Sequence, residues 1–591
     1  SKTVAFQARA AAMVGAAKFR VKIESDGLVS YEELDVPFAP NGPKTRQVTQ
    51  VALANGKLDL GQHLEGWLPT TEQSTVWVTP NPYGQAMTHL KHVVRYPHGC
   101  IEQTTSTAYP LVVLEDLLPE IGVEVPPEEL RDYAEHGVRR ILSFQTEGGG
   151  LSYWPGGDEP HAFATSFGLT ALIEAEKRGY DVPKDALERM ADYLELTLRK
   201  GDVTESIPHG NIADGDTRAL FVMTLGRLGR PQPAYLATLW DERAKLTPFG
   251  LSFLAIAASE MDGGHPLTEP ILAEVRAAAE QDAEAAWYDG DPKGGYSMDS
   301  PLRTHASALL AYASGARGHQ VTPKLLSGLL ERQRHGLWGN TQENVFGIMG
   351  VYTLASKAGV GGADAPKVGI THNGTDVPSE GLEVLSPSAR RLTLGPDDLA
   401  AAHHRFDLTS QGVSTNVTVR AEYDVQLTDA NREPRSSGAT IERRYETMSG
   451  EPLSDSIRLG ELVKVRLVVT TDEDLNYVAI DDKLPAGLEP LNTSLATTRS
   501  LDMGHLMPAV ERGLSHLSYQ EVRDHRVAFY ADELPAGTVE YQYVARATTP
   551  GAFLRPAAGV EAMYDLSTYA SSRIDHVAVV SDAVAASAGG Q

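Results

Sequence analysis

The sequence contains one cysteine, Cys100, in 591 residues. A single cysteine excludes an internal disulfide, which needs two thiols, and a metal site built from several thiolates. Any chemistry at Cys100 therefore uses a partner other than a second thiol. We expect no bound metal and no cofactor.

Positive charge and long apolar runs are also scarce. The 52 basic residues are outnumbered by 78 acidic ones, which gives a net charge of −26. A nucleic-acid partner is disfavoured, because phosphate backbones are bound by clustered Lys and Arg. No stretch approaches the ~20 consecutive apolar residues of a membrane span, so we expect no transmembrane segment.

The first residues, SKTVAFQARAAAMVG, lack the charged-then-apolar order of a secretion signal. The residues that follow already alternate between apolar and polar, as in a strand. The sequence therefore predicts an excised fragment whose targeting signal lay upstream. Its length predicts several domains, because one hydrophobic core rarely serves a chain this long.

Strand and helix patterns divide the chain into blocks. Residues 18–78 alternate apolar and polar positions between Pro- and Gly-containing breaks, which indicates strands. From about residue 83 to 360, apolar residues recur at helical spacing, which indicates about a dozen helices with no convincing strand between them. After residue 360 the strand pattern returns.

The helical block repeats a Gly- and aromatic-rich turn that leads through a threonine into a helix of small and apolar residues. The threonines are Thr165, Thr304 and Thr341, and we expect each to cap its helix. Repeated helical hairpins of this kind favour a closed α/α toroid. An open helical solenoid is the alternative.

The strand blocks on either side of the helices are each too small for a core of their own. We therefore expect the strands before Pro80 and those after Val360 to pair into one discontinuous β-domain that carries the helical domain as an insertion. Short, turn-separated strands in the last ~150 residues predict an antiparallel sandwich.

Three interpretations compete for Cys100. It is a buried small hydrophobe, or a catalytic nucleophile, or half of a reactive pair with Gln103. A nucleophile would need a histidine, and the candidates are His92, His98, His161, His209 and His305. The pairing interpretation uses spacing, because residues three apart meet across one helical turn.

A carboxamide held against the thiol can lose ammonia and become a γ-glutamyl thioester between Cys100 and Gln103. An amine or hydroxyl that reaches the carbonyl displaces the thiolate and becomes attached through Gln103. Water would destroy the same bond, so the protein must bury it. Pro97 and Gly99 supply a rigid turn and close backbone approach, and Tyr96 is the candidate lid.

The segment YPHGCIEQTTS, from Tyr96 to Ser106, resembles the thioester motif of the alpha-2-macroglobulin and complement family. It is most similar to the bacterial alpha-2-macroglobulins, which carry YPxGCLEQT. Ile101 stands where the animal version has glycine and the bacterial version usually leucine. Glu102 belongs to the motif, without a physical role beyond local polarity.

The resemblance spans essentially the whole chain. It implies the end of a macroglobulin-like domain (1–38), a CUB-like β-domain in two parts (39–82 and 361–427), an α/α-toroid thioester domain (83–360), and a C-terminal macroglobulin-like β-sandwich (428–591).

For function, the resemblance implies a broad-spectrum protease inhibitor of bacterial defence. In the family, a protease cuts a bait segment, the thioester becomes exposed, and the attacker is trapped covalently. The implied site residues are Cys100 and Gln103 for the thioester and Tyr96 as its shield, with Pro97, Gly99 and Glu102 in support.

The implied partners are proteases attached through lysine amines or other nucleophiles, and the upstream macroglobulin domains. Because His209 lies in no matching motif, no histidine is assigned to redirect transfer to hydroxyls. The implied location is the periplasm or cell envelope, with a possible lipid anchor on the parent chain.

A different class of function stays open. An α/α-toroid enzyme, such as a glycosidase or cyclase, would use carboxylates in the central cavity, for which Asp158, Asp214 and Asp299 are candidates. Replacing Cys100 by alanine separates the two classes, because only the trap depends on the thiol.

Overall fold

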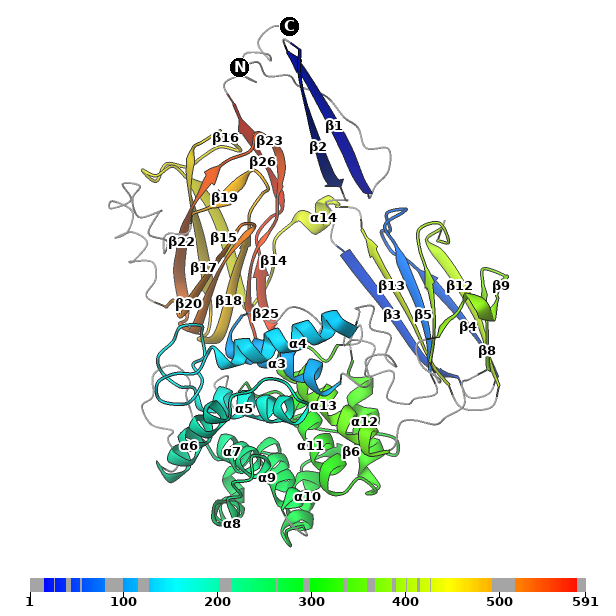
Figure 1. Ribbon diagram of the computed structural model, residues 1–591, viewed down its shortest axis with the longest axis vertical. Helices are drawn as coiled ribbons and strands as arrows, with labels where there is room; N and C mark the ends of the chain where they lie inside the picture. The colour runs from blue at the N-terminus through cyan, green and yellow to red at the C-terminus, as the bar shows by residue number, and fades with distance from the viewer. Residues whose placement is uncertain are drawn as a thin grey trace. The chain divides into compact units, whose positions relative to one another are not determined.

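The computed structural model describes sixteen segments of the chain (Figure 1). The described segments are 15–25, 27–38, 44–53, 56–79, 99–114, 127–200, 214–261, 264–290, 298–333, 337–358, 367–384, 389–399, 401–411, 415–425, 427–491 and 516–581. They form two compact units. The first contains residues 1–90, 117–124 and 360–431, and the second contains 91–116, 125–359 and 432–591.

The first unit is built of strands, as the alternation predicts. Its described elements are β1 Gly15–Ser25, β2 Leu28–Phe38, β3 Lys44–Leu53, β4 Gly56–His63, β5 Gln73–Thr79, β8 Lys367–His372, β9 Thr375–Val377, β10 Glu383–Val384, β11 Arg390–Leu394, β12 His403–Gln411 and β13 Thr415–Asp424. β1 and β2 form a hairpin. The others form sheets of order β10-β11-β5-β13-β3 and β4-β12-β8-β9.

Both of these sheets combine strands from distant parts of the sequence. β5 lies between β11 and β13, β3 pairs with β13, and β4 pairs with β12, all antiparallel. The strands before Pro80 are therefore hydrogen-bonded to strands that follow residue 360. Their inward side chains, including Val76, Phe406 and Val419, form one apolar core.

The second unit contains all the described helices from residue 101 to 358. They are α3 Ile101–Val113, α4 Pro127–Leu142, α5 Ala162–Lys177, α6 Lys184–Lys200, α7 Gly215–Arg227, α8 Pro233–Asp241, α9 Pro248–Glu260, α10 Thr268–Ala277, α11 Pro301–Gly315, α12 Val321–Glu331 and α13 Thr341–Ala358. A two-residue pair of strands, β6 Glu280–Gln281 and β7 Ala286–Trp287, interrupts them.

The odd-numbered helices form a closed cycle of contacts. Each of α3, α5, α7, α9, α11 and α13 packs on the next, and α13 packs on α3 (Figure 1). These inner helices are buried on nearly every side, as in α5 and α9. By contrast, α6 buries only one stripe, from Ala186 to Leu198, because its other face is polar.

The threonine caps predicted for the repeated turns are wrong at all three positions. Asn340 Oδ1 accepts from the Glu343 amide at 2.9 Å, so Thr341 is the first residue of α13 and does not cap it. His161 is the N-cap of α5 and Ser300 that of α11, so Thr165 and Thr304 lie one turn inside their helices. Thr165 instead donates to the His161 carbonyl and accepts from the Leu151 amide. A threonine at the fourth helical position bonds the preceding turn, so it does not cap the helix.

The second unit ends in a β-sandwich. Its strands are β14 Arg435–Ser437, β15 Ala439–Glu446, β16 Ser456–Arg458, β17 Leu462–Thr471, β18 Leu475–Lys483, β19 Leu488–Pro490, β20 Tyr519–Arg523, β21 Arg526–Leu534, β22 Gly537–Ala547, β23 Gly551–Arg555, β24 Ala558–Ala562, β25 Asp565–Ser571 and β26 Asp575–Val580. β17 shows the period-2 pattern: Val463, Val465 and Leu467 are buried, and the residues between them are more exposed.

Three sheets make up this region, of order β14-β25-β24-β18-β21-β20, β15-β17-β22-β19 and β16-β26-β23. All pairings are antiparallel except that of β16 with β26.

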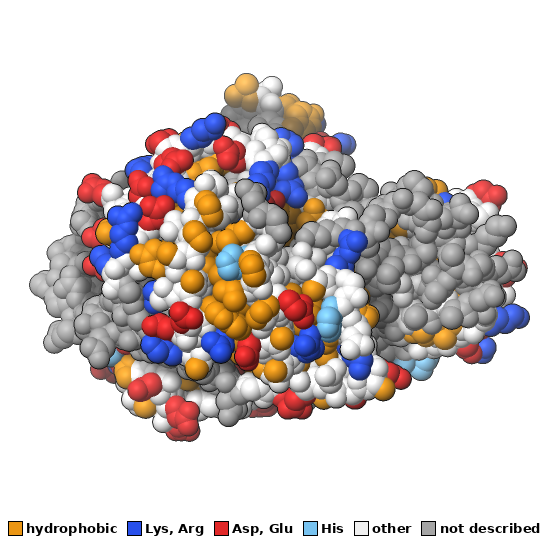
Figure 2. Space-filling model, turned by 90° about the horizontal axis from the view of Figure 1, so that it is seen from below, with side chains coloured by type: hydrophobic (Ala, Val, Ile, Leu, Met, Phe, Trp, Pro, Cys, Tyr) orange, Lys and Arg blue, Asp and Glu red, His pale blue; other side chains and the backbone are white. Residues whose placement is uncertain are grey.

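On the face of the molecule in Figure 2, charged side chains of both signs surround apolar ones. In the part of the chain described, no helix is long and apolar enough to cross a membrane.

Inner helices α7 and α9 approach closely at Gly250, where an added Cβ would lie 2.8 Å from Asp216 Cα. We expect Gly250→Ala to lower the free energy of unfolding by about 1–3 kcal/mol, because the two backbones must separate. Gly226→Ala on α7 is the matched control, since nothing lies within 4 Å of its added Cβ. The control should be neutral or stabilising by about 0.5–1 kcal/mol. Urea titrations measure both variants, and an equal loss of unfolding free energy in Gly250→Ala and Gly226→Ala would contradict the close approach of the two helices.

Candidate functional site

Cys100 and Gln103 face each other at the start of α3. Cys100 is the N-cap, with extended backbone (φ −70°, ψ 173°). The Gln103 amide donates to Cys100 Sγ at 3.4 Å, and the Cys100 amide donates to Gln103 Oε1 at 3.4 Å. This reciprocal pair is a capping box in which sulfur and carboxamide take the usual places of hydroxyl and carboxylate. The spacing therefore lets each side chain reach the backbone amide of the other residue.

Gly99 is required by this arrangement. Its φ is +92°, in the region that favours glycine, and an added Cβ would overlap the Gln103 carboxamide oxygen. Arg140 from α4 holds the same turn, because its Nη2 donates to the Gly99 carbonyl at 2.9 Å and its Nε donates to Thr104 Oγ1 at 3.2 Å. The predicted lid Tyr96 and its neighbour Pro97 lie outside the described residues.

The Cys100 side chain is completely buried. Burial, and next the charge of Glu102, raise the pKa of the Cys100 thiol to about 12, although hydrogen bonds from the Gln103 backbone and the Tyr153 hydroxyl act in the opposite direction. The thiol is therefore neutral at neutral pH.

Aromatic residues separate this turn from solvent. Tyr153 and Trp154, in the turn between α4 and α5, pack against the six-stranded sheet. The Trp154 ring lies 5.3 Å from Tyr519 and 4.8 Å from Tyr530, and its Nε1 donates to Asp532 at 2.8 Å. The Tyr153 carbonyl accepts from the Ile101 amide at 3.0 Å, which places this turn directly against the Cys100 peptide.

Glu102 has a defined role, in contrast to the local polarity expected from the sequence. Its carboxylate is fully buried. Oε1 accepts from Ser106 at 2.5 Å, Gln342 at 2.6 Å and Thr341 at 2.9 Å, while Oε2 accepts from Tyr564 at 2.7 Å and Thr341 at 2.9 Å. Every contact is a donor, which is the pattern that an ionised carboxylate needs. Glu102 thereby connects α3, α13 and the C-terminal sandwich.

The sequence did not single out Tyr153, Trp154 or Tyr564 as site residues. The first two stand in SYWPGG, a turn noted for its aromatic and glycine content. That composition is the signal that could have marked them. Nothing local marks Tyr564, because its position depends on how the sandwich packs on the helices.

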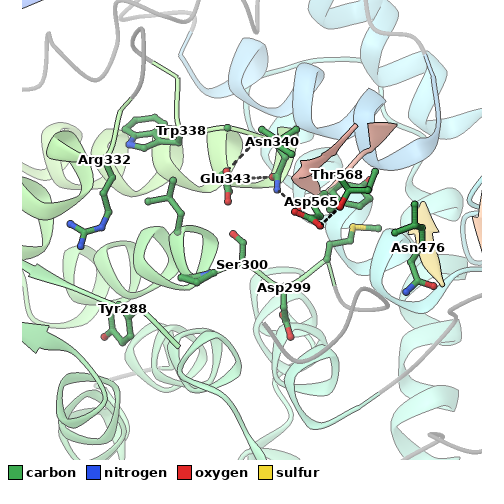
Figure 3. A pocket seen from close by; sticks show the side chains of 18 of the residues that line it. Tyr288, Asp299, Ser300, Arg332, Trp338, Asn340, Glu343, Asn476, Asp565 and Thr568 are labelled. Atoms are coloured by element: carbon green, nitrogen blue, oxygen red, sulfur yellow. Dashed lines mark hydrogen bonds between the residues drawn. The ribbon is translucent and has the colours of Figure 1, made fainter. Parts of the chain in front are cut away.

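A cleft of about 850 Å³ opens beside Tyr564 (Figure 3). The residues labelled on its walls are Tyr288, Asp299, Ser300, Arg332, Trp338, Asn340, Glu343, Asn476, Asp565 and Thr568. Asn340 Nδ2 donates to the Tyr564 carbonyl at 3.1 Å. The cleft wall is therefore continuous with the Glu102 contacts.

The carboxylates proposed for a toroid enzyme have other roles. Asp214 Oδ1 caps α7 by accepting from the Thr217 amide at 2.8 Å, and Asp299 accepts from the buried Arg303 at 2.5 Å. Asp158 is exposed. Among the residues described, no group of three or more His, Cys, Asp or Glu side chains is arranged to hold a metal ion.

Of the five histidines considered as partners of Cys100, two lie in the described part of the chain. His92, His98 and His209 lie outside the described residues. His305 is in contact with the Leu325 carbonyl, at 2.8 Å from Nε2. His161 caps α5 and packs 5.1 Å from the Tyr153 ring.

Comparison with known proteins matches the chain to alpha-2-macroglobulins of several bacteria. Residues 438–565 match the family model described as the bacterial alpha-2-macroglobulin MG10 domain. The alpha-2-macroglobulin of Xylella fastidiosa is 26% identical over 596 residues, which cover 97% of this chain and 34% of the relative. That of Escherichia coli K12 is 26% identical over 524 residues, which cover 85% of this chain and 29% of the relative.

Solved structures agree in fold. Salmonella alpha-2-macroglobulin reacted with methylamine has a TM-score of 0.75 at 24% identity and covers 96% of this chain and 36% of that one. Native E. coli alpha-2-macroglobulin from domain MG7 to the C-terminus has a TM-score of 0.75 at 22% identity. The match covers 96% of this chain and 88% of that one. The chain spans about a third of the curated relatives, and the resemblance read from the motif is confirmed.

Removal of the Glu102 carboxylate should destabilise the second unit. In Glu102→Ala, buried donors from Thr341, Gln342 and Tyr564 lose their acceptor, and each such loss costs about 1–3 kcal/mol. Glu442→Ala is the control, because Glu442 is 59% exposed and pairs with exposed Arg444, a contact worth less than about 1 kcal/mol. Unfolding in urea measures both, and similar small losses would contradict the role of Glu102.

The raised thiol pKa predicts slow alkylation. In Gln103→Ala, which leaves Cys100 without a carboxamide partner, iodoacetamide should react at pH 7 about a thousandfold more slowly in the folded protein than in urea. The factor follows from a pKa that rises from 9.0 to about 12, because only the thiolate reacts. The folded rate should increase about tenfold per pH unit between pH 7 and 9. Equal rates in both states would contradict the prediction.

Proposed function

Because this chain is related to the bacterial alpha-2-macroglobulins, we propose that Cys100 and Gln103 form an internal thioester that traps an attacking protease covalently. The observation that supports this proposal most directly is the capping box, in which the sulfur and the carboxamide each accept from the backbone amide of the other residue across one helical turn. The Salmonella protein that matches this fold has been solved after reaction with methylamine, a small amine.

The bond forms by condensation. The Cys100 sulfur attacks Gln103 Cδ, the Cδ–Nε2 bond breaks, and the thiol proton leaves with the nitrogen as ammonia. Negative charge develops on Oε1 during the attack, where the Cys100 N–H points from 3.4 Å at the positive end of α3. The backbone thus supports the tetrahedral intermediate.

The stored acyl group needs protection from water. Three features support this protection: the complete burial of Cys100, the edge-to-face rings of Tyr153 and Trp154, and the sheet residues Tyr519 and Tyr530 that pack on Trp154. Tyr96 remains the predicted lid. Once exposed, the carbonyl reacts with a lysine amine of the attacker, the thiolate leaves, and an amide joins Gln103 to the target. Each molecule reacts once, so the protein is a trap without turnover.

The architecture implied for this function is an α/α toroid inserted in a CUB-like domain, followed by a macroglobulin-like sandwich. The closed contact cycle from α3 to α13 supports the toroid. The antiparallel pairing of β3, β4 and β5 with β11, β12 and β13 supports the insertion. The boundaries proposed are 1–38, 39–82, 83–360, 361–427 and 428–591.

The function of the parent protein follows the same relation. We infer a broad-spectrum inhibitor of bacterial defence in which cleavage of an upstream bait segment exposes the thioester. Its partners are attacking proteases and the upstream macroglobulin domains. Its location is the periplasm or cell envelope, with a possible lipid anchor.

Mass spectrometry of the intact, freshly purified chain tests the thioester. We expect a mass lower than that of the sequence by one ammonia, and no thiol titratable after rapid unfolding with a thiol reagent present. Methylamine should add its own mass to the thioester form and release one thiol at Cys100.

Cys100→Ala is the control and should show neither the mass deficit nor methylamine addition. It should also abolish protease capture, whereas a toroid enzyme would keep its activity. A wild-type chain with full sequence mass, a free thiol and no methylamine adduct would overturn the proposal.

A further inference from the structure

The Arg140 side chain lies against the turn that carries Cys100. Its Nη2 donates to the Gly99 carbonyl at 2.9 Å, and its Nε donates to Thr104 Oγ1 at 3.2 Å. One guanidinium group thus contacts the residue before Cys100 and the residue after Gln103. It holds both ends of the segment in which the proposed thioester forms.

Arg140 is also held in place from its own side. It stands in the last turn of α4, where the helix dipole favours a positive charge. Its guanidinium carbon lies 5.5 Å from the centre of the ring of Phe144, a buried residue four positions further along the chain. In the described part of the chain, no carboxylate forms an ion pair with Arg140. Its positive charge is therefore fixed beside the turn.

One peptide group joins Arg140 to the Gln103 carboxamide. The Gly99 carbonyl and the Cys100 N–H belong to the same planar trans unit, in which they point in opposite directions. The carbonyl accepts from Arg140, and the N–H donates to Gln103 Oε1 at 3.4 Å. A cation on the carbonyl oxygen draws electron density away from the nitrogen, which makes the N–H a stronger donor.

Resting on the proposed thioester, we propose that Arg140 is a positioning residue that accelerates both formation and aminolysis of the bond by polarising the Gly99–Cys100 peptide. Negative charge develops on Gln103 Oε1 in the tetrahedral intermediate of either reaction. The Cys100 N–H is the donor that faces this oxygen. Because Arg140 acts through that donor, it is not itself a catalytic residue.

Arg140 keeps its own proton throughout. In formation, the sulfur bonds to Gln103 Cδ, Nε2 departs, and the thiol proton leaves with it as ammonia. In aminolysis, the nitrogen of an amine bonds to Cδ, the Cδ–S bond breaks, and the proton lost by the amine ends on the sulfur. Both reactions balance without another reactant, and both pass through an intermediate with a negative Oε1.

A purely structural role for Arg140 predicts a different result. If Arg140 only held the turn closed, its loss would let amines reach the bond more easily, and methylamine would react faster. Loss of polarisation weakens the donor to Oε1 and slows the same reaction. The direction of the rate change therefore separates the two roles.

Arg140→Met tests the proposal, because it removes the charge and both donors and keeps an unbranched side chain beside Phe144. We expect methylamine incorporation, and the appearance of the ammonia deficit during refolding, to slow about tenfold, a part of the ~10²–10³-fold cost of losing such a donor outright, since the Cys100 N–H itself remains. Arg139→Met is the matched control, because Arg139 is the neighbouring residue of α4, carries the same charge and is exposed. It should keep wild-type rates.

The single cysteine provides a direct readout of this peptide. In protein isotopically labelled at the cysteine nitrogen, the labelled backbone amide is that of Cys100 alone. A cationic donor on the preceding carbonyl shifts this amide signal downfield. We expect the signal to move upfield in Arg140→Met and to stay in place in Arg139→Met. In Arg140→Lys, which restores a cationic donor, the signal and the reaction rates should return towards wild type.

The outcomes separate this role from the thioester itself. If wild-type protein shows neither the ammonia deficit nor a methylamine adduct, the proposed function falls, and the role of Arg140 with it. If wild type reacts and Arg140→Met reacts as fast or faster, or leaves the Cys100 signal unmoved, the role of Arg140 alone is overturned. Should Arg140→Met not fold, Arg140→Lys must react faster than Arg140→Gln, which can donate but carries no charge. Equal rates of those two variants would overturn the role.

Discussion

The second unit depends on a charge placed where water does not reach. Glu102 is fully buried, and a buried carboxylate is tolerated only when donors satisfy it. Its donors come from α3 itself, from the start of α13, and from Tyr564 in the sandwich. The cost of leaving this charge unpaired therefore holds helices and sandwich in one arrangement. The aromatic packing of Trp154 on Tyr519 and Tyr530 follows from that arrangement.

Local backbone geometry places Cys100 and Gln103 on the first turn of α3. Gly99 adopts a conformation closed to other residues, Cys100 stops the chain in an extended N-cap, and α3 then places Gln103 one turn later. Arg140 secures the carbonyl in front of this turn. These are short-range constraints, and the motif contains nearly all of them.

The contrast between short-range constraints and contacts of distant segments explains what the sequence could predict. Period-2 and period-3.6 patterns identified the strands and helices, because each depends on neighbours within a few residues. The approach of Cys100 to Gln103 was predictable for the same reason. The caps at His161 and Ser300 were missed because Thr165 and Thr304 also suit a helix start. The roles of Glu102, Tyr153 and Tyr564 were beyond reach, since they depend on contacts between segments hundreds of residues apart.

The cap position of Cys100 has a mechanical consequence for the proposed thioester. An acyl link between N-cap and third residue closes the first turn of α3 into a covalent ring, so the helix start cannot fray while the bond persists. Cleavage would leave a weak sulfur acceptor and, on Gln103, a bulky amide that no longer fits beneath Gly99. Breaking the bond would thus loosen the start of α3, where Glu102 lies. The contact between Glu102 and the sandwich would then change with the chemical state of Gln103.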